Sequence, residues 1–233
     1  MKINTKKSLK STLMMIICLV SFIKFSGCSE DDILIPVVTY SNLSVYHVDM
    51  ITGNLDIQIN NVVAASNVVY LERLNYQQLL PGNNNLKIQN ASGTTLIDTT
   101  FFLSENNYYS VFIYDVGGVA KPLIVTDNLT NPGTTNSSVR FINFAPGAGS
   151  LALGGTSKPS PWFPNEAYGV PASFRPITGG VYNLYMNEAF TPVTLATLID
   201  QTLAAGRIYT IIGKGIAGGT GNQNIGIVVY NNQ

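Results

Sequence analysis

The run Leu55-Asp56-Ile57-Gln58-Ile59-Asn60 decides the fold class of this chain, because apolar and polar residues alternate along it with a period of two. That period places its three apolar residues on one face of a strand and its polar residues on the other. Leu86-Lys87-Ile88-Gln89 repeats the pattern, and Tyr109-Ser110-Val111-Phe112-Ile113-Tyr114 is rich in the residues that favour strands. These runs predict half-buried strands.

Clusters of turn-forming residues separate the runs: Pro81-Gly82-Asn83-Asn84-Asn85, Asn90-Ala91-Ser92-Gly93 and Gly117-Gly118. Short strands at this spacing are typical of a β-sandwich or barrel. No segment after residue 27 combines helical periodicity with capping residues. We therefore expect an all-β fold.

The strand pattern begins again in the second half of the chain. Ser44-Val45-Tyr46-His47-Val48-Asp49 aligns with Ser138-Val139-Arg140-Phe141-Ile142-Asn143, and the segment around Leu103 and Tyr109 aligns with that around Leu203 and Tyr209. The residues between the copies are rich in Asn, Thr, Gly and Pro, as linkers often are. The sequence predicts two tandem Ig-like antiparallel β-sandwich units, 42–127 and 138–233, joined by a linker at 128–137.

Tyr109 and Tyr209 each follow a leucine by six residues. In Ig-like sandwiches, a tyrosine near the start of the sixth strand buries its ring and returns its hydroxyl group to an upstream backbone group. We expect Tyr109 and Tyr209 to form such tyrosine corners, with Leu103 and Leu203 in the core beneath them. The alternative is that both are ordinary core aromatics.

The N-terminus has the features of an export signal. Four lysines precede the apolar stretch 12–23, which is too short to span a bilayer as a mature helix, and Phe25-Ser26-Gly27-Cys28 follows. This arrangement resembles a bacterial lipoprotein signal, which implies cleavage after residue 27 and acylation of Cys28. The alternative is a plain secretory signal with an incidental cysteine. Several acyl chains on Cys28 would anchor the protein stably to a membrane.

The residues after Cys28 bear on localisation. Ser29 is not the aspartate expected for retention in the inner membrane, so the outer membrane is favoured. Glu30, Asp31 and Asp32 resemble an acidic export signal that sends some lipoproteins to the cell exterior; the alternative is a solvated tether on the periplasmic face. We assign residues 28–41 to the lipidated cysteine and this acidic tether.

Charge and cysteine content exclude several classes of function. Residues 1–27 contain five of the 13 basic residues and none of the 13 acidic ones, so the mature chain has a net charge of −5. A negative chain is a poor match for nucleic acid or for electrostatic docking on anionic lipid. Cys28 is the only cysteine that remains, which excludes an internal disulfide.

No catalytic group is evident along the sequence. His47 is the only histidine, and the acidic residues are scattered singly without the spacing of a calcium loop. We therefore predict no catalytic residue, no metal site and no cofactor. A carboxylate pair assembled by the fold would leave a hydrolase with a cleft between the two units as an alternative.

The segment Phe144–Pro176 is the most promising place for a ligand. It contains six prolines, which stiffen a loop and disfavour central strands, together with Trp162, Phe163 and Tyr168. These three aromatics are candidate ligand-binding residues, for a sugar ring or a protein anchor. The alternative, which we favour, is that Trp162 fills the second core.

The tandem first strands, the later Pro/Gly turns and the Leu-x5-Tyr strands resemble the bacterial domain of unknown function 4397, over roughly Leu43–Tyr230. The resemblance implies secreted or lipid-anchored β-sandwich units and no known activity. We expect a non-enzymatic binding or structural module of the cell envelope with a glycan or protein partner. Strand addition at the edge formed by Ile225–Tyr230, as an accessory subunit of a surface assembly, is a further alternative.

Overall fold

Strands make up nearly all the regular structure of the computed structural model, which describes residues 38–156 and 160–233. The first half contains β1 (Ser41–His47), β2 (Leu55–Ile59), β3 (Val62–Val68), β4 (Arg73–Leu79), β5 (Gly82–Asn90), β6 (Thr95–Leu103), β7 (Tyr108–Val116) and β8 (Val119–Asp127). The second half contains β9 (Asn136–Phe144), β10 (Leu151–Gly155), β11 (Phe163–Glu166), β12 (Arg175–Thr178), β13 (Gly180–Glu188), β14 (Thr194–Leu203), β15 (Ile208–Lys214), the short 3-10 helix η1 (Gly221–Gln223) and β16 (Gly226–Asn231).

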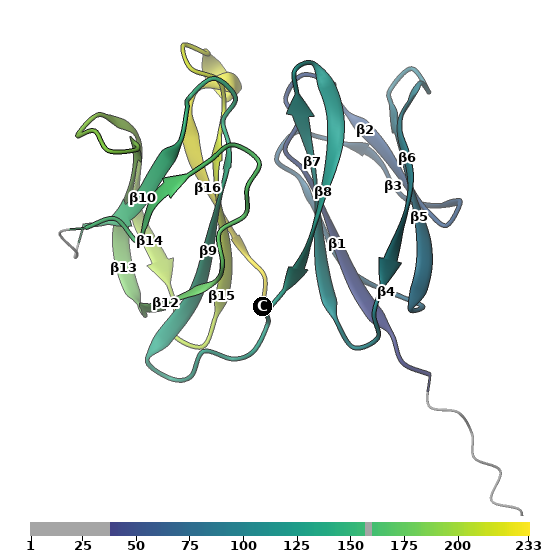
Figure 1. Cartoon of the computed structure of the whole chain (residues 1–233), viewed down its shortest axis with the longest axis horizontal. Helices are drawn as coiled ribbons and strands as arrows, with labels where there is room; N and C mark the ends of the chain where they lie inside the picture. The colour runs from purple at the N-terminus through teal and green to yellow at the C-terminus, as the bar shows by residue number, and fades with distance from the viewer. Residues whose placement is uncertain (1–37, 157–159) are drawn as a thin grey trace, which may run out of the picture. The chain divides into compact units, whose positions relative to one another are not determined.

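Each half is a sandwich of two four-stranded sheets with the same strand order. The first sandwich has the sheets β4-β1-β7-β8 and β3-β2-β5-β6, and the second has β12-β9-β15-β16 and β11-β10-β13-β14. The strands of each sandwich can be followed in Figure 1. Every strand of the second half thus occupies the place of the strand eight positions earlier. The prediction of an all-β chain with two sandwiches is confirmed.

One strand pair in each sandwich is parallel, namely β1 with β7 and β9 with β15. All other strand pairs are antiparallel. The parallel pairs bring the first and seventh strands of each sandwich together in the middle of a sheet. Within the described residues, no helix is long and apolar enough to span a membrane.

Matching register partners corrects the predicted alignment of the two halves by two residues. Tyr109 lies beside Leu43 and Tyr209 lies beside Val139, so Leu43 is equivalent to Val139. His47 is therefore equivalent to Asn143, although the sequence comparison had paired Asp49 with that residue. A shift of two residues keeps the same side chains on the same face, which is why hydrophobic pattern alone did not reveal it.

The sheet β3-β2-β5-β6 has the alternating burial that the sequence predicted. In β2, the side chains of Leu55, Ile57 and Ile59 are buried, and those of Asp56 and Gln58 between them are more exposed. The buried residues join the core of the first sandwich. Antiparallel sheets with one solvated face show this pattern.

The central strands of the sheets β4-β1-β7-β8 and β12-β9-β15-β16 bury both of their faces. Odd-numbered residues of β1, β7, β9 and β15 enter the sandwich cores: Leu43, Val45, Tyr109, Val111, Ile113, Val139, Phe141, Tyr209 and Ile211. Even-numbered residues of the same strands form a third apolar cluster: Tyr46, Phe112, Ile142, Phe144 and Ile212. The third cluster draws on both halves of Thr39–Gln233, which form one compact unit.

The segment Phe144–Pro176, predicted as a stiff loop, contains regular structure. It includes β10, β11 and the first half of β12. β10 lies inside its sheet and has no proline. Pro164 lies in β11 and Pro176 in β12, and both strands are at sheet edges, where a missing backbone donor is tolerated.

Candidate functional site at the junction of the sandwiches

The third apolar cluster packs the two sandwiches against each other. Tyr46 stacks on Phe112 with ring centroids 4.5 Å apart, and Phe112 packs on Phe144 at 5.2 Å. Tyr230 approaches Tyr46 edge-on at 5.0 Å, and its hydroxyl group donates to Leu71 O at 2.9 Å. Tyr46, Phe112 and Leu71 belong to the first half, and Phe144 and Tyr230 to the second, so this cluster makes the junction a continuous apolar contact.

A buried ion pair crosses the same junction. Arg140, in β9, places Nη1 2.6 Å from Oδ1 of Asp127, the last residue of β8. The side chains are 2% and 0% exposed. Arg140 Nη2 also donates to Ser110 Oγ at 3.1 Å, and Ser110 Oγ donates to Asp127 Oδ2 at 2.6 Å. Arg140 thus contacts two strands of the sandwich to which it does not belong.

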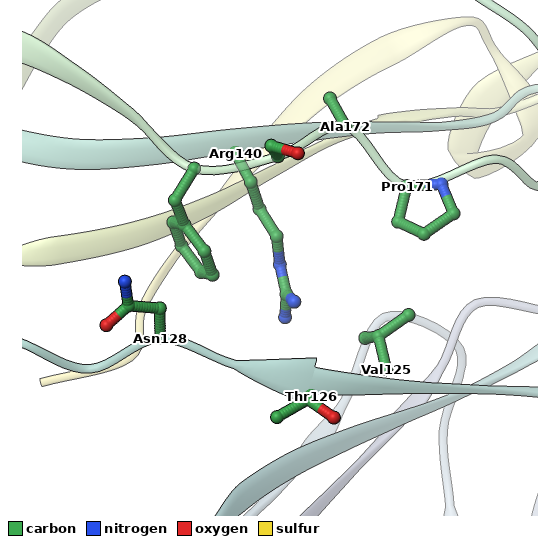
Figure 2. Close-up of a pocket in the computed structure, with 8 residues that line it drawn as sticks. Val125, Thr126, Asn128, Arg140, Pro171 and Ala172 are labelled. Atoms are coloured by element: carbon green, nitrogen blue, oxygen red, sulfur yellow. The ribbon is translucent and has the colours of Figure 1, made fainter.

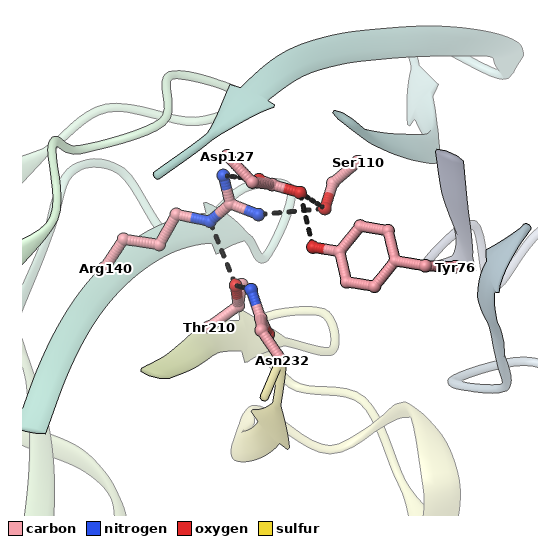
Figure 3. Close-up of polar contacts among 6 residues, drawn as sticks. All are labelled: Tyr76, Ser110, Asp127, Arg140, Thr210 and Asn232. Carbon is pink, nitrogen blue, oxygen red and sulfur yellow. Dashed lines mark hydrogen bonds and ion pairs between the residues drawn. The ribbon is translucent and has the colours of Figure 1, made fainter. Parts of the chain in front are cut away.

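Residues from both sandwiches complete the network around this ion pair (Figure 3). Tyr76 donates its hydroxyl hydrogen to Asp127 Oδ2 at 2.6 Å. On the other side, Arg140 Nε donates to Thr210 Oγ1 at 2.9 Å, and Asn232 Nδ2 donates to the same oxygen at 2.9 Å. A buried charge pair is tolerated when such additional hydrogen bonds satisfy its remaining atoms.

The surroundings of the guanidinium group are aromatic as well as polar. Arg140 Cζ lies 5.5 Å from the ring centroid of Phe112 and 4.8 Å from that of Phe174. Cation–π contacts of this kind strengthen when water is excluded. Burial, with a smaller contribution from the charge of Asp127, raises the pKa of Tyr76, so its hydroxyl remains a hydrogen-bond donor at neutral pH.

A groove of about 450 Å³ lies beside this network (Figure 2). Val125, Thr126 and Asn128 line it from the first sandwich and the segment that follows β8, and Pro171 to Phe174 line it from the second. Arg140 extends from the second sandwich toward the first at its base. The groove therefore combines amide and hydroxyl groups with one aromatic ring and one arginine.

Asn128 also lines a smaller hollow of about 320 Å³. The other residues of this hollow are Asn106, Asn107, Tyr108, Asp127, Leu129 and Thr130. Asp127 is the only acidic residue among those that line the groove and the smaller hollow, and its carboxylate is paired with Arg140. The two hollows together give a polar surface around Asn128, without a pair of carboxylates facing each other across it.

Trp162 and Phe163, two of the three candidate ligand-binding residues, lie in the core of the second sandwich, where Trp162 is 6% exposed and Phe163 0%. This is the position that the favoured alternative gave Trp162, which meets Tyr182 edge-on at 5.1 Å. Tyr168 is half-buried; it packs on Tyr114, with ring centroids 5.8 Å apart, and donates its hydroxyl hydrogen to Asp115 O. Trp162 and Phe163 therefore present no ring face for a ligand to stack on.

Tyr109 and Tyr209 occupy equivalent positions and make equivalent contacts. The hydroxyl oxygen of Tyr109 accepts a hydrogen bond from Ser104 N–H at 3.1 Å, and that of Tyr209 accepts one from Ala204 N–H at 3.0 Å. Both rings are buried. Each tyrosine therefore fixes the turn that precedes its own strand.

Three other groups of residues were singled out from the sequence. Cys28, Ser29, Glu30, Asp31 and Asp32 lie outside the described residues. His47 is fully buried and places Nε2 2.7 Å from Gly53 O. β16 is an edge strand, as the strand-addition alternative requires, but Arg73 Nη1 donates to Asn231 O at 2.7 Å and occupies its end.

Sequence reasoning did not identify Arg140 and Asp127 as partners. A usable signal was present, because Arg140 is a charged residue inside the apolar run Val139-Arg140-Phe141-Ile142. A charged group at such a position is rarely buried without a partner. No feature of the sequence distinguishes Asp127 from the other acidic residues as the partner of Arg140.

A family model described as a domain of unknown function (DUF4397) matches residues 41–154. The match begins at the first residue of β1, covers the whole first sandwich and extends through β9 into β10. It therefore includes both Asp127 and Arg140. The wider resemblance, extending to Tyr230, stays a prediction. No curated protein matches the chain.

Proposed function

We propose that this chain is a lipid-anchored module of the cell envelope that binds a glycan at the groove between its two sandwiches and performs no chemistry on it. Cys28 would carry the lipid, and the acidic tether would place the sandwiches at the outer membrane, facing the exterior. The observation that carries the binding proposal is the groove, whose two walls are held together by the Arg140–Asp127 network.

The composition of the groove favours a sugar. Thr126, Asn128 and Ser173 are exposed and offer hydroxyl and amide groups, and the half-buried ring of Phe174 offers an apolar face. Sugars are recognised by such combinations of hydrogen-bonding groups and ring stacking. Because Arg140 fixes the two walls relative to each other, little ordering would accompany binding, which favours affinity.

A glycan array probed with the purified full chain tests this proposal. We expect binding that Phe174→Ala reduces at least tenfold, because the substitution removes the aromatic face of the groove. Phe102→Ala is the matched control, since Phe102 is an exposed aromatic on β6 with no part in the groove. Equal losses in both variants, or no glycan binding at all, would overturn the glycan assignment.

The same assay separates the alternatives. Cleavage of an arrayed glycan, measured by the release of reducing ends, would show a hydrolase. Capture of an envelope protein that Phe174→Ala prevents, without any glycan hit, would show a protein partner at the groove.

The anchor is tested separately, by mass spectrometry of the mature N-terminus. We expect a diacyl or triacyl modification on Cys28, and its loss in Cys28→Ser. Antibody labelling of intact cells, compared with lysed cells, distinguishes the exterior from the periplasmic face. An unmodified mature N-terminus would reject lipid anchoring and leave the groove proposal standing.

A further inference from the structure

Two aspartates meet at one end of the first sandwich. β1 and β7 run parallel, with Val45 beside Val111 and His47 beside Ile113. Val48 N–H donates to Ile113 O at 2.9 Å, so the pairing continues beyond the end of β1. Two residues beyond the last pair, the same register would bring Asp49 beside Asp115.

Both side chains are buried. Asp115 shares a face of β7 with the core residues Val111 and Ile113, because side chains two residues apart in a strand share a face, and Asp49 follows the end of β1. Asp49 is 1% exposed and Asp115 is 8% exposed. Oδ1 of Asp49 accepts a hydrogen bond from Ile51 N–H at 2.8 Å, whereas Oδ2 of Asp49 and Oδ1 of Asp115 are buried without a hydrogen-bond partner among the described residues. Neither carboxylate forms an ion pair, since Arg140–Asp127 is the only one among the described residues.

One further oxygen atom in the same region also lacks a partner. Thr52 Oγ1 is buried without a hydrogen bond among the described residues. Thr52 lies next to Asp49, because its backbone N–H donates to Asp49 Oδ1 at 3.4 Å. Unpartnered buried polar atoms are rare in folded proteins, and each is costly.

The second sandwich provides an internal comparison. His47 Nε2 lies 2.7 Å from Gly53 O, and the equivalent Asn143 donates Nδ2 to Gly149 O at 2.9 Å. With His47 and Asn143 matched, Ala145 occupies the position of Asp49. Gly215 is next to it, in the position of Asp115. The fold therefore needs no carboxylates here, and the first sandwich has two.

We propose that the carboxylates of Asp49 and Asp115 form a buried site for a hard divalent cation, with Ca²⁺ as the best match. A doubly charged cation would neutralise both acids, whose burial without compensation is strongly unfavourable. Carboxylate and hydroxyl oxygens are the ligands that Ca²⁺ and Mg²⁺ prefer, and Ca²⁺ tolerates irregular geometry better. Within residues 38–156 and 160–233, no three His, Cys, Asp or Glu side chains are grouped to hold a metal, so hydroxyl, backbone or water oxygens would have to complete the coordination of the cation.

The site would also affect the junction. Tyr168, from the second sandwich, donates its hydroxyl hydrogen to Asp115 O. A cation that fixes Asp115 would therefore steady the residue that Tyr168 contacts. This role is independent of whether the groove binds a glycan.

The test is direct analysis of metal in the purified full chain, followed by thermal unfolding with and without added CaCl₂ or MgCl₂ after treatment with EDTA. We expect about one Ca²⁺ per chain and a rise in Tm of about 5–10 °C at a concentration one hundred times Kd. Mg²⁺ is expected to raise Tm less. Asp49→Asn and Asp115→Asn should each abolish the Ca²⁺ response, while Asp98→Asn, which alters an exposed acid on β6, should keep it.

Metal analysis of the wild-type chain keeps the test decisive if a variant fails to fold. A chain without bound divalent cation, whose Tm does not respond to Ca²⁺ or Mg²⁺, would overturn the proposal. A Ca²⁺ response that survives in both variants would place the site elsewhere and overturn it as well.

Discussion

Replacing Arg140 with methionine tests how the two sandwiches are held together. The substitution removes the positive charge and keeps most of the apolar stem. Asp127 would stay fully buried, with hydrogen bonds from Ser110 and Tyr76 but without its ion-pair partner. Removing one partner of a buried ion pair costs about 3–5 kcal/mol, because it leaves an uncompensated charge. For a chain of this size, that loss corresponds to a fall in Tm of roughly 6–20 °C.

The double variant Arg140→Met/Asp127→Leu separates two free energies: the cost of leaving Asp127 buried without a partner, and the net contribution of the ion pair to stability. Apolar replacement of both partners of a buried ion pair is often close to neutral. We therefore expect the double variant to be more stable than Arg140→Met alone, by about 2 kcal/mol or more. Arg207→Met is the matched control, since Arg207 is exposed and forms no ion pair with any residue that the structure describes.

Urea denaturation followed by two signals is the appropriate assay. Fluorescence of Trp162, the only tryptophan, reports on the core of the second sandwich, and far-UV circular dichroism reports on both sandwiches. Coincident transitions in the wild type would show that the sandwiches unfold together. A loss below about 1 kcal/mol for Arg140→Met, or additive effects in the double variant, would refute the view that Arg140 and Asp127 form a water-excluded pair.

Four further substitutions test other contacts by the same denaturation assay. Tyr109→Phe and Tyr209→Phe should each lower stability by about 1 kcal/mol, because each removes a part-buried hydrogen bond from a backbone N–H; unchanged midpoints would reject the tyrosine corner. Gly155→Ala should cost about 1–3 kcal/mol, since a Cβ there would lie 2.5 Å from the ring of Trp162; a neutral result would mean that the ring moves aside freely. Tyr76→Phe should cost about 1.5–3 kcal/mol by removing a donor to a charged carboxylate, and a stability equal to wild type would indicate that water replaces the hydroxyl.

The sequence predicted the fold class and the two sandwiches because local pattern carries that information. The alternation in β2 has one cause, a core on one side and solvent on the other. The tyrosine and leucine spacing was informative for a similar reason, since Tyr109 and Tyr209 contact residues only five positions upstream.

The junction could not be predicted, because an apolar run does not say what covers it. Val111, Phe112 and Ile113 are all buried, but Phe112 faces the other sandwich and its neighbours face their own core. The proline-rich segment was misjudged for a related reason: proline limits a strand to an edge but does not prevent one.

Two of the three predicted ligand residues are buried in the core. Trp162 and Phe163 are large apolar side chains, and the second core had room for them. Tyr168 instead packs on Tyr114 at the junction of the sandwiches. The aspartates at the end of β1 and β7 were missed because spacing along the chain cannot show which residues a parallel register brings together.

The parallel pairing of β1 with β7 has a consequence for how this chain reaches its native state. β1 is the first strand made, yet its partner β7 and the sheet that covers its other face come much later in the sequence. Closing such long loops before any contact forms is entropically costly and slows folding. A slow search of this kind leaves the apolar faces of β1 exposed in the unfolded chain, which makes them natural binding sites for chaperones until β7 and the covering sheet have formed.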